Sequence, residues 1–392
     1  MSEFNTRRVA GLDLVRSAAI LSVVIGHYWP IFERFPALAP LKTFGMLGVE
    51  IFFVLSGFLI GGILLRQAHD VSGSVGGFSL RHAPGFWMRR WFRTLPNYAL
   101  FFVLFLILDQ PWTKDSWGAW ALSALFLQNL FVDLSAGTYG IAWSLCVEEW
   151  LYLLLPILLA VFTARQKNPG KAALFSALVL ILVPTVLRLN TVGKAWDLGV
   201  RHIVIYRLDA IAYGVLLAYF ARYRRAIFER LARPSSAWTG AAGLVGVSIF
   251  WWMIGEPWIT ADTARNGQQW AIMSVLFFPA MSLCIVPIVA WSNSIEEMPK
   301  GCRTAVYRTS LYSYSMYLGH TLVFLFTDTV VYRALSANFG EFRGMTFVMA
   351  ALTLIALYGF SALVFHAWES PMTRLRERFA PVHVASPTAP LS

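Results

Sequence analysis

Long apolar runs, each near the length needed to cross a bilayer, constrain this chain more than any other feature. A helix spans the hydrocarbon core with about 20 apolar residues. Eleven segments approach that length, at 11–31, 43–65, 95–110, 115–132, 141–163, 172–190, 203–221, 236–254, 269–291, 309–328 and 345–367. Hydrophobic residues make up 57% of the 392 residues and charged residues 14%, which excludes a soluble protein. The sequence therefore predicts an all-α, polytopic transmembrane helical bundle.

Cationic residues in the connecting loops predict the topology. Lys and Arg concentrate in cytoplasmic loops. Here they gather at 7–8, 66–94, 165–171, 222–233, 300–308 and 374–378. These segments share one side only if an even number of crossings separates residues 94 and 165. We therefore predict that 115–132, which is short and ends in Gln128-Asn129, is a re-entrant or interfacial helix. About ten spans remain, and both termini are cytoplasmic.

Two parts of the chain depart from this regular pattern. The predicted outer loop 191–202 carries Lys194 and Arg201, against the charge rule. Residues 381–392 are rich in Pro, Ala and Ser, so we expect a disordered cytoplasmic tail after one membrane domain at 1–380.

The net charge of +11 could indicate nucleic-acid binding in a soluble protein. In this chain the basic residues lie in loops that meet anionic head groups, so membrane lipids are the expected partners and nucleic acid is not. The three cysteines, Cys146, Cys284 and Cys302, are too widely spaced to indicate a zinc site or a disulfide framework. We expect no metal.

Ionisable residues inside the apolar segments are the main functional signal. They are costly in lipid and face the bundle interior or a water-filled cavity. The set comprises Asp13, Arg16, His27, Glu50, Glu148, Glu149, Arg207, Asp209 and His320. Together they predict one shared polar cavity, to which we also assign Ser56, Trp143, Ser144 and Tyr317. Because Arg207 and Asp209 lie on nearly opposite faces of a helix, we expect them to pair with different partners.

The first predicted span places Arg16 and His27 on one helical face. They are eleven residues apart, a rise of about 16 Å. Arg16 therefore lies near the cytoplasmic end and His27 well across the membrane. The structural alternative is that Asp13 forms a salt bridge with Arg16 while His27 bonds a neighbouring helix.

Three arginines follow the second predicted span. Arg89, Arg90 and Arg93 lie among Trp87 and other aromatic residues. Guanidinium groups suit phosphates and aromatic rings suit a nucleobase. The alternative is a topology signal that binds lipid head groups.

Two further groups leave both interpretations open. Glu148 and Glu149 are adjacent within a span, and one of them could simply pair with a cation such as Arg16. Tyr317 and His320 lie one helical turn apart, on a polar stripe that could line a cavity or bond neighbouring helices.

Five stretches of this sequence resemble membrane acyltransferase family 3, the bacterial family that O-acylates carbohydrates. They are the Arg16–His27 spacing, GVEIFFVLSGFLI at 48–60, RRWFRTLP at 89–96, WSLCVEEWLYLLLP at 143–156 and RLDAIAYGVLLA at 207–218, with SYSMYLGH at 313–320 and ESP at 369–371 fitting the end of the pattern. Glu50, Cys146 and Trp150 depart from the commoner Asp, Ser and Gln, and none of these changes removes a charge.

The resemblance implies ten helices, a cytoplasmic acyl-CoA donor, acetyl-CoA by preference, and a glycan or other hydroxyl acceptor, possibly lipid-linked. It implies a multi-pass protein of the bacterial cytoplasmic (inner) membrane. On this basis we expect His27 to act as base or acyl carrier, with Glu148 or Glu149 orienting it. Arg16 would polarise or guide the thioester, and Arg89, Arg90 and Arg93 would hold CoA phosphates.

Two other classes would also explain a charged cavity. A transporter or flippase of a polar or lipid-linked substrate is the first, although no inverted repeat is visible in the sequence. The second is an assembly partner of polysaccharide synthesis without chemistry of its own.

Overall fold

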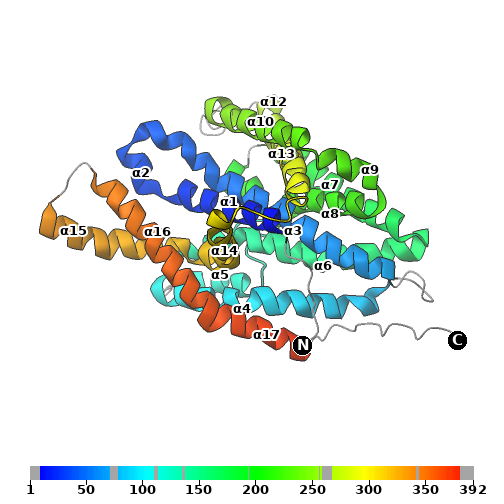
Figure 1. Cartoon of the computed structure of the whole chain (residues 1–392), viewed down its shortest axis with the longest axis horizontal. Helices are drawn as coiled ribbons and strands as arrows, with labels where there is room; N and C mark the ends of the chain where they lie inside the picture. The colour runs from blue at the N-terminus through cyan, green and yellow to red at the C-terminus, as the bar shows by residue number, and fades with distance from the viewer. Residues whose placement is uncertain are drawn as a thin grey trace.

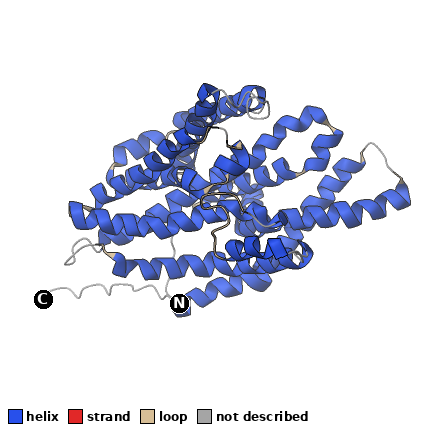
Figure 2. Ribbon diagram, turned by 180° about the vertical axis from the view of Figure 1, so that it is seen from behind, coloured by secondary structure: helices blue, strands red, loops and turns tan. Residues whose placement is uncertain are grey.

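The computed structural model describes residues 9–70, 78–109, 114–134, 137–192, 194–255, 257, 267–340 and 344–379. Every regular element in these ranges is helical, and Figure 2 shows helices joined by loops. The longer helices are α1 (Ala10–His27), α3 (Thr43–Asp70), α4 (Ala83–Asp109), α5 (Lys114–Ala124), α6 (Trp143–Gln166), α7 (Pro169–Leu187), α8 (Leu208–Tyr223), α10 (Pro234–Phe250), α13 (Phe277–Ser292), α14 (Lys300–Phe326), α16 (Met345–Val364) and α17 (Ser370–Phe379). Shorter helices are α2 (Trp29–Arg34), α9 (Arg225–Leu231), α12 (Gly267–Ala271) and α15 (Tyr332–Phe339). The predicted all-α bundle is confirmed (Figure 1).

Eight helical segments of the described chain are long and apolar enough to cross a membrane. They are Ala10–His27, Pro36–Asp70, Leu80–Leu108, Tyr139–Gln166, Pro169–Asn190, Pro234–Gly255, Gln268–Ser292 and Met345–Leu375. Two other predicted spans correspond to α8, which has only 16 residues, and to α14, whose 27 residues include many Tyr and Ser. A count of ten spans and cytoplasmic termini therefore stay predictions, and the proposed tail at 381–392 lies outside the described residues.

The segment predicted not to span is short in the structure as well. Helix α5 has 11 residues, about 16 Å, which is too little to cross the hydrocarbon core. An irregular stretch follows it and is held against the residues before α8. The Val204 N–H donates to the Asn129 carbonyl (2.9 Å), and the Ile205 N–H donates to the Leu130 carbonyl (3.4 Å). These bonds fix the 128–134 stretch beside 202–205.

Close packing between α3 and α8 depends on two glycines. A Cβ atom on Gly57 would lie 1.9 Å from the Ile211 carbonyl oxygen, and one on Gly214 would lie 2.0 Å from the Val54 carbonyl oxygen. Small residues allow membrane helices to approach this closely. Packing rather than a ligand therefore accounts for Gly57, and the contact holds α3 in the middle of the bundle (Figure 1).

Candidate active site

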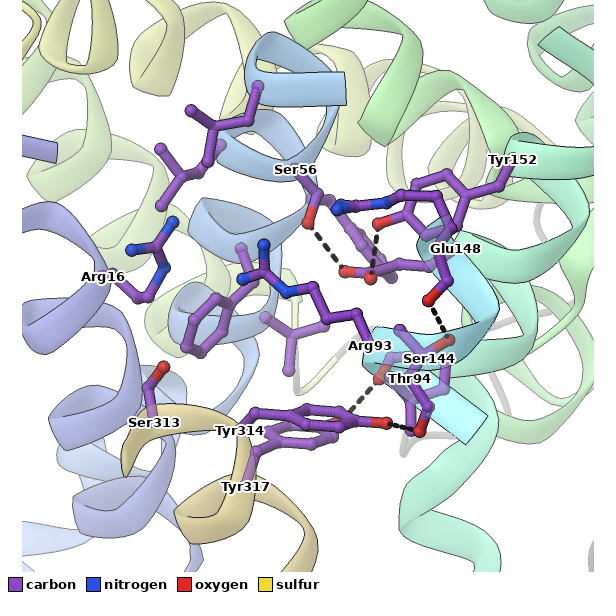
Figure 3. A pocket seen from close by; sticks show the side chains of 17 residues that line it. Arg16, Ser56, Arg93, Thr94, Ser144, Glu148, Tyr152, Ser313, Tyr314 and Tyr317 are labelled. Atoms are coloured by element: carbon purple, nitrogen blue, oxygen red, sulfur yellow. Dashed lines mark hydrogen bonds between the residues drawn. The ribbon is translucent and has the colours of Figure 1, made fainter. Parts of the chain in front are cut away.

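A cavity of about 100 Å³ opens between α1, α3, α4, α6 and α14, and we call it the Arg16 cavity. Figure 3 shows its polar side chains converging from these helices. The polar residues that line it are Arg16, Ser56, Arg90, Arg93, Thr94, Ser144, Glu148, Tyr152, Ser313, Tyr314 and Tyr317. The expected residues Arg16, Ser56, Arg90, Arg93, Ser144, Glu148 and Tyr317 thus meet in one place.

Glu148 is held on the wall of this cavity by two hydroxyl groups. Ser56 Oγ donates to Glu148 Oε1 (3.1 Å) and Tyr152 OH donates to Glu148 Oε2 (2.8 Å). The Arg90 guanidinium lies 5.1 Å from the centre of the Tyr152 ring, within the range of a cation–π contact. The neighbouring Glu149 is buried and accepts from Thr94 Oγ1 (2.7 Å), and it does not line the cavity.

The arginines of the Arg16 cavity differ in whether they form salt bridges or hydrogen bonds with other side chains. Arg16 forms a salt bridge with Asp13 (3.2 Å) and donates to Ser310 Oγ (3.1 Å), so the structural pair that the sequence left open is present. Asp13 itself is buried outside the cavity lining. Arg93 is exposed, and it forms no salt bridge or hydrogen bond within the part of the chain that the structure describes. Arg89 lines neither of the two cavities described here.

A second cavity, of about 460 Å³, lies beyond the end of α1, and we call it the His27 cavity. Its polar and aromatic lining comprises His27, Trp29, Lys42, Thr43, Trp143, Trp196, Asp197, Arg201, His202, Trp251, Tyr317 and His320. His27 Nδ1 lies 2.7 Å from the Val23 carbonyl. Because a carbonyl only accepts, Nδ1 carries a proton and a neutral His27 keeps its lone pair on Nε2. Gly45 makes room for the ring, since a Cβ there would lie 3.0 Å from His27 Cε1.

The prediction of one shared cavity is wrong in detail, because Arg16 and His27 line two different cavities. Val49 and Tyr317 line both, so the cavities meet at these two side chains. The Tyr317 and Ser144 hydroxyls are hydrogen-bonded (2.6 Å), which fixes Tyr317 between them. Arg16 and His27 line different cavities because eleven residues of helix place the imidazole about 16 Å from the guanidinium along the axis of α1.

The expectation that Glu148 or Glu149 orients His27 is also wrong. Both carboxylates bond hydroxyl groups on the Arg16 side, as described above. The nearest ring to His27 is His320, with 5.2 Å between ring centroids. His320 is 1% exposed, and its Nδ1 lies 2.6 Å from the Tyr317 carbonyl. The main chain therefore fixes both imidazoles.

Glu50, Arg207 and Asp209 do not line either cavity, against the prediction of one shared chamber. Arg207 pairs with Glu50, and Asp209 pairs with Arg188 (2.6 Å). All four side chains are at most 1% exposed. The prediction that Arg207 and Asp209 have different partners is confirmed, and these charges serve as closed ion pairs between helices.

Sequence reasoning missed a cluster on the wall of the His27 cavity. The missed residues are Trp196, Asp197, Arg201 and His202, which line the cavity, and Asp133, which contacts His202 but is not part of the lining. His202 Nδ1 lies 3.1 Å from Asp133 Oδ2, and His202 Nε2 lies 3.7 Å from Asp197 Oδ1. Arg201 donates to Asp197 (2.7 Å). Arg201 and Lys194 broke the charge rule, which was the one available signal, while no sequence pattern links Asp133 to His202.

Neighbouring groups stabilise the ionised form of the Asp197 carboxyl. Burial favours a raised pKa for Asp197, but the charges of Arg201 and His202 outweigh it and hold the pKa below its usual range. Asp197 therefore stays a carboxylate at neutral pH. Among the described residues, no group of three or more His, Cys, Asp or Glu side chains is placed to hold a metal ion.

This chain is similar to a family of acyltransferase domains and to several bacterial proteins. A family described as an acyltransferase domain matches residues 9–366. Peptidoglycan O-acetyltransferase OatA of Listeria monocytogenes is 26% identical over 274 residues, which are 64% of this chain and 40% of that protein. The putative peptidoglycan O-acetyltransferase YrhL of Bacillus subtilis is 33% identical over 193 residues, which are 44% of this chain and 27% of that protein.

A putative O-acetyltransferase of Staphylococcus aureus is 26% identical over 236 residues, which are 54% of this chain and 35% of that protein. The chain thus matches less than half the length of each of these relatives. No solved structure matches significantly.

Proposed function

Because the chain belongs to this acyltransferase family, whose pattern covers residues 9–366, we propose that it is a membrane-embedded O-acyltransferase with an acyl-CoA donor. The acyl group is acetyl, and the acceptor is a hydroxyl of a cell-surface or exported glycan. Two relatives are named for peptidoglycan, which makes peptidoglycan strands the first acceptor to test. The bacterial relatives support a place in the cytoplasmic membrane.

One observation carries the proposal: a guanidinium-lined cavity and an imidazole-lined cavity meet at Tyr317. A CoA thioester combines phosphates, which guanidinium groups bind, with a long arm that ends at the reacting carbon. Arg93 and Arg90 would hold the phosphates at the mouth of the Arg16 cavity. The arm would then run past Arg16 toward Tyr317.

Acyl transfer to a hydroxyl also needs a nitrogen base or nucleophile and stabilisation of the developing oxyanion. The Nε2 lone pair of His27 meets the first need, because the Val23 carbonyl holds the proton on Nδ1. Arg16 lies about 16 Å along α1 from His27, too far to bond this oxyanion, and would instead guide the thioester arm through the Arg16 cavity. Its partner Asp13 keeps this guanidinium in place.

The test uses purified full-length protein in lipid nanodiscs with labelled acetyl-CoA and peptidoglycan strands free of acetyl esters. The wild type should release CoA only as acetyl esters form, whereas a transporter or flippase would leave the thioester intact. His27→Ala should lower ester formation by at least about 100-fold while the protein stays folded. Normal acetylation by folded His27→Ala would refute the assignment of this imidazole.

A further inference from the structure

The His27 cavity holds a second imidazole, that of His202, whose position the family comparison does not explain. Its Nδ1 lies 3.1 Å from Asp133 Oδ2. Since a carboxylate only accepts, His202 donates from Nδ1 and keeps its lone pair on Nε2. A base oriented by a carboxylate is the arrangement that activates hydroxyl groups in acyl-transfer enzymes.

Three contacts hold this imidazole in place. Its ring stacks on Trp143, with 4.5 Å between centroids and 16° between planes. Asn129, which is fully buried, donates from Nδ2 to the carbonyls of Trp143 and His202. The main-chain bonds from 129–130 to 204–205 bring the 128–134 stretch alongside and so deliver Asp133 to the ring. The 128–134 stretch, which follows α5, thus positions a carboxylate on an imidazole 69 residues away.

The division of the site into two cavities requires a second base, and His202 is placed to act as one. If the donor occupies the Arg16 cavity and the acceptor the His27 cavity, an acyl group can pass between them on His27. Once acylated on Nε2, His27 has no lone pair left to act as a base. The acceptor hydroxyl must then lose its proton to another group that faces the His27 cavity.

We infer that His202, oriented by Asp133, is the base that takes the proton of the acceptor hydroxyl in the His27 cavity. The inference rests on the proposed function. His202 is then a catalytic residue, and Asp133 is a positioning residue. Asp197 Oδ1 also lies near this ring, 3.7 Å from Nε2.

Acyl transfer then takes two steps. In the first, His27 Nε2 attacks the thioester carbonyl, a C–N bond forms, the C–S bond breaks, and CoA leaves as a thiolate. In the second, the acceptor oxygen attacks the acyl carbon while His202 Nε2 takes its proton, a C–O bond forms and the C–N bond breaks. His27 is regenerated, the proton on His202 passes to water, and the thiolate takes a proton from water.

Other groups in the same cavity are weaker candidates for this base. Within the described parts of the chain, His320 Nε2 has no hydrogen-bond partner and no carboxylate orients the ring, and the His320 side chain is almost fully buried. Asp197 is already paired with Arg201. The charged and titratable groups that face His202 are Asp133, Asp197 and Arg201, with His27 across the cavity.

The experiment separates the two steps, again with full-length protein in nanodiscs. [14C]Acetyl-CoA without acceptor measures the covalent label on the denatured protein. Addition of peptidoglycan strands measures loss of label to esters. We expect His202→Gln to take up label within about 2-fold of the wild type but to transfer it at least about 100-fold more slowly. Asp133→Asn should slow transfer by at least about 10-fold.

Two further readouts exclude a merely structural effect. The double variant Asp133→Asn/His202→Gln should be no slower than His202→Gln alone, because the two residues act as one unit. The pH profile of the transfer rate should differ between His202→Gln and the wild type, because the variant lacks the group that takes the proton. His69→Gln, which removes an exposed imidazole of α3, is the matched control and should behave as wild type.

Wild-type transfer by a labelled, folded His202→Gln protein would overturn the assignment, and so would equal loss of both steps in that variant. If the wild type takes up no label, the acyl-His27 step and this role of His202 both fall. The proposed function is scored separately, as alkali-labile acetate in the envelopes of cells that express the protein. That measurement depends neither on the intermediate nor on the identity of the acceptor.

Discussion

The Glu50–Arg207 ion pair allows a quantitative test of the interpretation that the charges between α3 and α8 are structural. Both side chains are fully buried, and the Arg207 guanidinium lies 3.8 Å above the centre of the Phe278 ring. Glu50→Gln leaves that guanidinium without its countercharge, and removing one member of a buried pair costs about 3–5 kcal/mol. The Arg188–Asp209 pair nearby is already complete and cannot replace it.

This cost converts into a measurable shift of the melting temperature. Water-soluble proteins gain about 2.1 cal/mol/K per residue on unfolding, or roughly 0.8 kcal/mol/K for a chain of this length. A loss of 4 kcal/mol then lowers Tm by about 5 °C. The shift should be larger in detergent, where helices persist after tertiary contacts are lost and the entropy change is smaller.

The assay is tryptophan fluorescence during heating in one detergent, since the chain has 16 Trp residues. The double variant Glu50→Met/Arg207→Met replaces the pair by apolar side chains of similar length and should melt within about 2 °C of the wild type, because apolar replacement of a buried pair is often neutral. The reasoning fails if Glu50→Gln melts as the wild type does, or if the double variant loses the sum of the two single effects.

Three further predictions concern other parts of the molecule. Arg93→Gln should weaken acetyl-CoA binding by about 10–100-fold in calorimetry, because it removes a charged hydrogen-bond donor. The control Arg225→Gln, at an exposed ion pair on α9, should leave binding unchanged. Equal affinities of the two variants would indicate that Arg93 contacts lipid and not acetyl-CoA. Gly214→Ala should destabilise the α3–α8 contact by at least about 1–3 kcal/mol, since its Cβ would lie 2.0 Å from the Val54 oxygen. The control Gly62→Ala on α3, where a Cβ would meet open space, should leave the stability unchanged. Asp197→Asn should lower Tm at neutral pH, because Asp197 has a lowered pKa and stabilises the fold only while it is ionised. The difference from wild type should begin to shrink as the pH falls below the usual carboxyl pKa of about 3.9 and should vanish only below the lower pKa of the folded state. A difference that does not shrink as the pH falls below about 3.9 would contradict this.

The fold could be predicted to the level of helices, but not of all their ends. Helix α4 begins at Ala83 and α14 at Lys300, well before the predicted spans at 95–110 and 309–328. Apolar length identified the long helices. The charge rule required that one segment between residues 94 and 165 does not span, and short length with a polar end indicated 115–132, in agreement with the 11 residues of α5. The cost of charges in lipid correctly indicated that Arg207, Asp209 and Glu50 face inward. It could not say whether they face water or each other, because both solutions remove the charge from lipid.

The candidate site was predicted in its residues and missed in its arrangement. Arg16, Arg93, Glu148 and Tyr317 do meet, because they lie on inward faces of helices that pack together. His27 lies in a separate cavity, because helical rise carries it past Tyr317. The Asp133–His202 contact was missed, since it depends on main-chain bonds between two irregular stretches that no periodicity describes.

The sequence by itself determined that the helices lie in a lipid bilayer, how long they are and which residues must avoid lipid. Each of these follows from the transfer free energy of side chains along a single helix. Only the tertiary structure decided which buried charges neutralise one another and which remain available to a ligand. It also decided that two cavities meet at Tyr317 and that Asp133 reaches His202. These outcomes depend on how helices distant in the chain approach one another, and residues such as Gly57 and Gly214 set that approach through backbone contacts that hydropathy does not encode.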